Sequence, residues 1–108
     1  MEETLKNPFI LEAHKIILST IPLDEYVIFV FGSRAGKNFK DYSDLDVGVW
    51  GEHPIPLSIF YQVKELLEES TIPYKVDIID FRRASDDFKK IALEKIQIWN
   101  QPAHLKVN

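Results

Sequence analysis

The chain has 108 residues, which suffices for one hydrophobic core, and we expect a single domain over residues 1–108. Its formal net charge of −4 argues against broad nucleic-acid binding, which usually shows a basic face. No apolar run is long enough for a membrane span, and the absence of cysteine excludes disulfides and thiolate metal sites. The N-terminus lacks the basic and apolar regions of a signal peptide, so we expect a cytoplasmic protein without membrane contact.

The order of apolar patterns along the chain predicts an α/β or α+β fold, a small mixed sheet flanked by helices. We expect helices over 8–20, 57–70 and 85–99, strands over 26–31, 44–50 and 74–79, and a short helical turn within 33–43. Asn7-Pro8 starts the first helix, and Ser85 caps the last one. The segment from about 101 to 108 is expected to be a loose tail.

The first predicted strand ends in a turn suited to phosphate. Tyr26–Phe31 is almost wholly apolar, so we expect a central strand buried on both faces, and Gly32-Ser33 follows it directly. A glycine without a Cβ lets phosphate oxygens approach the backbone, where the amides of a strand-to-helix turn attract anions. The Ser33 hydroxyl can donate to a phosphate, and Arg34 either adds positive charge or only braces the loop.

The second predicted strand carries paired carboxylates. Asp44 and Asp46 are two residues apart and therefore project to the same face, with Leu45 turned into the core. Asp77 interrupts the third apolar strand, which is most easily explained if it faces the same site. Three carboxylates in one place suit Mg²⁺ and can hold two metal ions, which would bridge a triphosphate.

A purely structural interpretation of the same residues is also open. Gly32-Ser33 would then be an ordinary turn, Asp44 a cap at the start of a strand, and Asp46 a polar residue of an edge strand. His53, in a proline-containing loop, is a weaker candidate for ligand contact, and Asp80 is expected only to cap the turn after its strand.

The spacing of these residues resembles a known family. Gly32-Ser33, ten intervening residues, Asp44-Leu45-Asp46 and a later strand with Asp77 resemble a minimal nucleotidyltransferase of the DNA polymerase β superfamily. Ser33-Arg34-Ala35 and the run from Tyr42 through Ser43 to Asp46 are also similar to that family. The order Gly36-Lys37 departs from it, because many members have a basic residue before the glycine.

The resemblance implies a polymerase-β-like fold and transfer of a nucleoside monophosphate, most often AMP from Mg-ATP, to a hydroxyl. It implies that Asp44 and Asp46 bind both Mg²⁺ ions and that Asp77 binds the catalytic ion and helps to deprotonate the acceptor. Gly32, Ser33, Arg34 and Ser43 are the nucleotide-binding positions that it implies.

The resemblance also implies a partner. Short members are similar to the smaller member of two-protein pairs whose other member is a helical HEPN or substrate-binding protein, and several such pairs are toxin–antitoxin systems. Two other functions stay open: a regulatory subunit that neutralises its partner by binding alone, and the catalytic subunit of a small-molecule nucleotidyltransferase.

Overall fold

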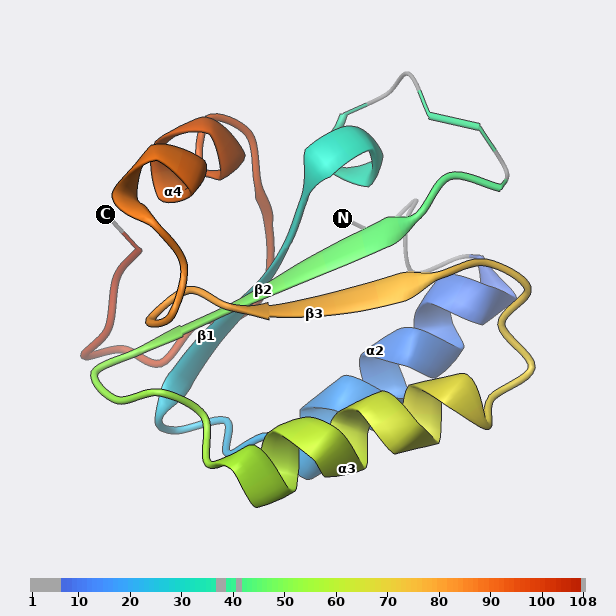
Figure 1. The fold of residues 1–108 in the computed structure, drawn as a ribbon, viewed down its shortest axis with the longest axis horizontal. Coiled ribbons are helices and arrows are strands. Elements are labelled where there is room, and N and C mark those ends of the chain that lie inside the picture. The colour runs from blue at the N-terminus through green and yellow to red at the C-terminus, as the bar shows by residue number, and fades with distance from the viewer. Residues whose placement is uncertain (1–6, 37–38, 41, 108) are drawn as a thin grey trace.

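The computed structural model describes residues 7–36, 39–40 and 42–107, and Figure 1 shows their arrangement. The elements in chain order are α2 (Pro8–Thr20), β1 (Tyr26–Phe31), the 3₁₀ turn η1 (Gly32–Ala35), β2 (Leu45–Gly51), α3 (Leu57–Glu68), β3 (Val76–Asp80), α4 (Asp86–Ala92) and β4 (Gln97–Asn100). Asn7 caps α2, since its Oδ1 accepts hydrogen bonds from the amides of Phe9 and Ile10.

The strands form one mixed sheet in the order β3-β2-β1-β4. β1 pairs antiparallel with β2 and β4, whereas β2 pairs parallel with β3. Every residue of β1 is buried, which confirms the predicted central strand. Because β2 is also internal to the sheet, the interpretation of Asp46 as an edge-strand residue is wrong.

Side-chain alternation along β1 divides the core between the two faces of the sheet. Ile28 and Val30 pack with α2 and α3 in the larger hydrophobic cluster. Phe29 and Phe31 pack on the other face, where α4 supplies Ala92. Figure 1 shows α2 and α3 together on one side of the sheet, with η1 and α4 on the other. The α2–α3 layer therefore supports the sheet, and the opposite face is only partly covered.

The predicted last helix is wrong in its second half. α4 ends at Ala92, and residues 97–100 form β4, which pairs with β1. Without β4 the β1 backbone would be an unpaired sheet edge, so strand pairing there satisfies more backbone groups than a longer helix would. Trp99 points to the α2 side of the sheet while Ile98 packs on the other side, an alternation that belongs to a strand.

The C-terminal segment packs against the sheet. Leu105, within the segment expected to be loose, is buried and packs in the cluster on the α4 side of the sheet. None of the helices in the described part of the chain has the length and apolar character needed to cross a membrane.

Asp80, the last residue of β3, joins the strand to the loop between β2 and α3. Its side chain is buried and accepts hydrogen bonds from the Ile55 amide at 2.9 Å and the Arg82 amide at 3.0 Å. Arg83 Nε pairs with Asp80 Oδ2 at 3.2 Å. Asp80 thus caps the turn, as expected, and also anchors a distant loop.

We expect Asp80→Ala to lower the free energy of unfolding by about 2–3 kcal/mol, because buried donors lose their acceptor. Urea unfolding followed by circular dichroism measures this. Asp80→Asn keeps an acceptor oxygen and should cost less, and Asp24→Ala, at an exposed position, should cost little. Equal stability of Asp80→Ala and the parent chain would contradict the anchoring role.

Candidate active site

Gly32 begins η1 with a backbone that favours glycine. Its φ of +73° lies in the left-handed region, and a Cβ built at this position would lie 2.5 Å from Asp46 Oδ2. The turn and the Asp46 carboxylate are therefore in direct contact range, which only a residue without a side chain allows. Gly32 and Ser33 are both exposed, so the turn is accessible from solvent.

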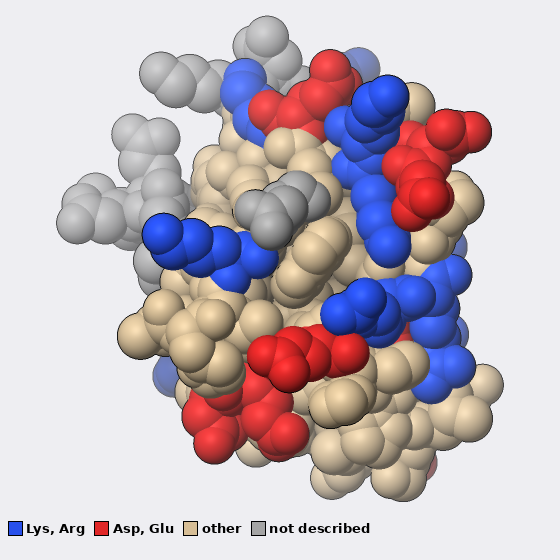
Figure 2. All heavy atoms as spheres, turned by 90° about the vertical axis from the view of Figure 1, so that its left-hand side faces the viewer, with Lys and Arg blue, Asp and Glu red and all other residues tan. Residues whose placement is uncertain are grey.

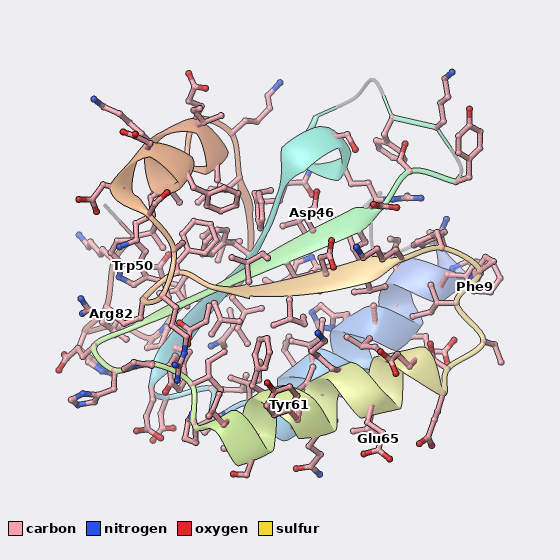
Figure 3. The ribbon with its side chains drawn as sticks, in the orientation of Figure 1. Phe9, Asp46, Trp50, Tyr61, Glu65 and Arg82 are labelled. Atoms are coloured by element: carbon pink, nitrogen blue, oxygen red, sulfur yellow. The ribbon has the colours of Figure 1, made fainter. Side chains whose placement is uncertain are left out.

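Strand register brings the carboxylates together. Asp46 lies opposite Phe31 on β1 and beside Asp77 on β3. Residues paired in neighbouring strands are about 5 Å apart and project to the same face. Figure 3 shows Asp46 on the side of the sheet that faces away from α2 and α3. The pairing therefore places Asp77 on the same face of the sheet as Asp46, as the sequence analysis expected.

The electrostatics of Asp46 reflect two neighbouring acids. Burial raises the pKa of the Asp46 carboxyl first, and the charges of Asp77 and Asp44 raise it further, while Lys75 opposes them. Lys75 Nζ lies 3.5 Å from Asp77 Oδ2 on an exposed part of the strand. Asp44 itself is exposed, directly before β2. The site is thus an acidic cluster whose central member is partly withdrawn from water.

Arg34 is buried, with 2% of its surface exposed, and its polar contact is to the loop. Its Nε donates to the Ser43 carbonyl at 2.9 Å, and its guanidinium lies 4.2 Å from the ring centre of Tyr74 and 4.9 Å from that of Phe39. Of the two roles left open by the sequence, the structure favours bracing. Arg34 fixes the residue that immediately precedes Asp44.

Ser43 takes part in the same loop. Its Oγ accepts from the Lys40 amide at 3.0 Å, and its own amide donates to the Lys40 carbonyl at 3.0 Å. The Ser33 carbonyl accepts from the Gly36 amide at 3.2 Å, which closes η1. Lys37, where the sequence departs from the family pattern, lies outside the described residues.

The donor set of Asp44, Asp46 and Asp77 fits a hard divalent cation in its chemistry. All three ligands are carboxylates, and their mutual repulsion at Asp46 is the kind that a bound cation relieves. Within 7–36, 39–40 and 42–107, however, no three acidic or histidine side chains already converge as a metal-binding group. Asp46 and Asp77 share a face of the sheet, and with Asp44 they do not form a closed ligand set.

The sequence analysis missed two side chains that reach η1 from the C-terminal part of the chain. Gln97 Nε2 donates to the Ala35 carbonyl at 3.1 Å, and Lys95 lines one hollow together with Gly32. The alternation Ile96-Gln97-Ile98 has the period of a strand, and that signal predicts that Gln97 faces away from its apolar neighbours.

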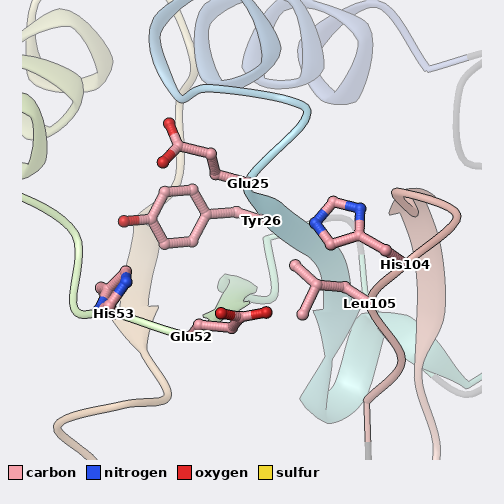
Figure 4. Close-up of a pocket in the computed structure, with 6 residues that line it drawn as sticks. All are labelled: Glu25, Tyr26, Glu52, His53, His104 and Leu105. Carbon is pink, nitrogen blue, oxygen red and sulfur yellow. The ribbon is translucent and has the colours of Figure 1, made fainter.

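His53 lies elsewhere. It lines a hollow of about 180 Å³ with Tyr26, Glu52 and His104, shown in Figure 4. Tyr26 pairs with Gly51 at the start of β1, whereas the carboxylate site lies at the end of that strand. His53 therefore does not belong to the carboxylate site.

A glycine turn after a central strand, beside carboxylates on two adjoining strands, defines a nucleotidyltransferase of the polymerase β type. The family described as "Polymerase beta, Nucleotidyltransferase" matches residues 23–103, and the chain belongs to it. A relative from Haemophilus influenzae, "Probable protein adenylyltransferase MntA", is 36% identical over 77 residues, which cover 71% of this chain and 67% of that protein.

Solved structures share the fold. A toxin–antitoxin crystal structure with AMP-PNP is 23% identical, with a TM-score of 0.64, and covers 81% of this chain and 69% of the other. A tri-AMPylated Shewanella oneidensis HEPN toxin in complex with its MNT antitoxin is 23% identical, with a TM-score of 0.60 over 86% of this chain and 73% of the other. These likenesses confirm the predicted polymerase-β-like architecture.

We expect Asp46→Asn to raise the melting temperature by a few degrees at pH 7 in EDTA. The pKa of the Asp46 carboxyl is raised in the folded state, so the folded protein binds the carboxyl proton more tightly than the unfolded chain does. At neutral pH the carboxylate is charged, and this charge lowers the stability of the folded state. That cost arises as the pH rises through the ordinary value of 3.8 toward the raised pKa. The difference between variant and parent should therefore shrink in acid.

Calorimetric scans of both proteins from pH 7 downward measure this effect. Asp24→Asn, at an exposed position, is the matched control and should melt as the parent chain does. A lower melting temperature for Asp46→Asn in EDTA would mean that the carboxylate stabilises the fold, contrary to the electrostatic argument.

Proposed function

We propose that this nucleotidyltransferase transfers AMP from Mg-ATP to a hydroxyl group on a HEPN-type partner protein, as the antitoxin of a toxin–antitoxin pair. The observation that carries the proposal is the register that places Asp46 beside Asp77, with the Gly32 turn against Asp46. Support for adenylyl transfer comes from the 36% identity to the Haemophilus influenzae protein. The HEPN partner is suggested by the complex of similar fold.

The reaction that this site suits is an in-line displacement at the α-phosphorus. The acceptor oxygen forms a bond to phosphorus, the bond to the oxygen bridging the α- and β-phosphates breaks, and pyrophosphate leaves. The hydroxyl proton passes to a base, and Asp77 is the carboxylate we assign to this role. Asp77 lies on β3, an edge strand of the sheet, where an acceptor from another molecule has access.

In this function the Gly32 turn binds the phosphates of the nucleotide. The exposed Gly32 turn lies against the Asp46 carboxylate, and the exposed Ser33 hydroxyl can donate to a phosphate oxygen bound there. Arg34 acts indirectly, because its bond to the Ser43 carbonyl holds the chain that leads into Asp44. Ser43 accordingly contributes through loop geometry.

Asp44, Asp46 and Asp77 would hold the divalent cations. When bound, such ions neutralise charge on the triphosphate and activate the attacking oxygen, as two-metal sites do. The acidic cluster also explains why the chain needs them: without cations, three carboxylates would repel the phosphates that the turn is shaped to receive.

The test is transfer of label from ATP carrying radioactive phosphorus at the α-position, in Mg²⁺, with the HEPN-type protein as acceptor. We expect the parent chain to label the partner and release pyrophosphate. The variant Asp44→Ala/Asp46→Ala should lose transfer by about a hundredfold or more, because the metal ligands are gone. Label on the β- or γ-phosphate should not transfer.

The matched control is Asp86→Ala/Asp87→Ala, which removes an equal number of carboxylates from α4 and should keep transfer within about twofold. A parent chain that neutralises its partner without labelling it, equally well after Asp44→Ala/Asp46→Ala, would replace the enzymatic function by a regulatory subunit. Labelling of a small-molecule alcohol in place of the partner would point to the other nucleotidyltransferase function.

A further inference from the structure

Lys95 reaches the glycine turn from the opposite end of the sequence. Its Nζ lies 3.7 Å from the position that a Cβ on Gly36 would occupy, at the end of η1. The connection between α4 and β4 is held there by the pairing of β4 with β1 and by the Gln97 bond to the Ala35 carbonyl. The backbone that carries Lys95 is therefore held next to η1 by the sheet.

The charge of Lys95 has no partner carboxylate among the residues that the structure describes. Lys95 is exposed, whereas Arg34 is buried and committed to the Ser43 carbonyl. An exposed ammonium group beside the η1 turn suits a polyanion. It offers the positive charge that Arg34, from inside the loop, does not present to solvent.

Lys95 also forms one wall of a hollow of about 360 Å³ that starts at Gly32. Its apolar lining is made by Phe31 from β1 and by Phe88 and Ile91 from α4, and Glu94 adds a carboxylate. Phe88 packs edge-on against Phe31, with ring centres 5.8 Å apart, whereas Ile91 is 71% exposed. Sites for small ligands combine such an apolar lining with a few fixed polar groups, and this volume is at the small end of their range.

This hollow adjoins the carboxylate site, because its lining residue Phe31 pairs with Asp46 in the sheet and its lining residue Gly32 lies against the Asp46 carboxylate. If the phosphates of a nucleotide bind at the turn, its nucleoside can extend in one of two directions, toward β3 or toward α4. The β3 side carries the charged pair Asp77 and Lys75, whereas the α4 side adds aromatic and aliphatic surface to its charged residues Glu94 and Lys95. A planar base is best accommodated on the α4 side.

We propose that the hollow between η1 and α4 is the nucleotide-binding groove, in which Lys95 binds the phosphate chain and the Phe88–Ile91 wall contacts the base. This inference rests on the proposed function and assigns specific residues to its substrate. Glu94, which lines the same hollow, provides an acceptor for an amino group on the base.

The test compares Lys95→Met and Ile91→Ser with the parent chain in the transfer assay, with adenosine as competitor. Lys95→Met should raise the KM for ATP about tenfold with little change in kcat, and leave inhibition by adenosine unaltered. Ile91→Ser should weaken both ATP and adenosine, because it removes the contact to the base. Lys90→Met, an exposed lysine of α4, is the charge-matched control and should change neither.

Equilibrium binding of ATP in Mg²⁺, measured by calorimetry, makes the result independent of transfer. If the parent chain binds ATP but labels no acceptor, the proposed function fails while the groove is still tested by the same variants. An unchanged ATP affinity in Lys95→Met, with an unchanged melting temperature, would overturn the phosphate role. Unchanged adenosine binding in Ile91→Ser would overturn the base site.

Discussion

The placement of a half-buried carboxylate in the middle of a sheet is the constraint on which this structure depends. Asp46 lies between β1 and β3, in contact range of the Gly32 turn and beside Asp77. Burial and neighbouring acids both disfavour its charge. Such an arrangement persists only where the backbone is held rigidly, and here the paired strands on both sides and the α2–α3 layer beneath them supply that rigidity.

Two basic side chains near the site, Arg34 and Lys95, differ in their exposure to solvent. Arg34 is withdrawn from water, stacked against Tyr74 and bonded to the Ser43 carbonyl, so it shapes the loop that precedes Asp44. Lys95 stands in solvent on the α4 side of η1. Figure 2 shows the side of the molecule at the left of Figure 1, where acidic and basic side chains lie next to one another.

The sequence predicted those parts of the site that depend on local pattern. The apolar run before Gly32 predicts the buried β1, and the interrupted apolar pattern of the third strand predicts that Asp77 lies on the face of Asp46. The second strand was expected to include Asp44, but β2 begins at Leu45. The contribution of residues 95–97 was not predictable in the same way, because the apolar spacing through Trp99 also fits a helix. What decides between helix and strand there is the unpaired edge of β1, which is a property of the assembled sheet.

The strand order places the acidic residue Asp77 and the Gly32 turn on different strands of the sheet. Asp77 lies on the edge strand β3, and the sheet continues from there through β2 to β1 and the turn, with α4 beyond it. A nucleotide seated between η1 and α4 would therefore present its α-phosphorus toward Asp77 from one side only. The other side of Asp77 is the edge of the sheet, where the attacking hydroxyl would arrive in the proposed reaction. An acceptor contributed by a second protein fits that geometry, because a partner docked along β3 would reach Asp77 without displacing the nucleotide.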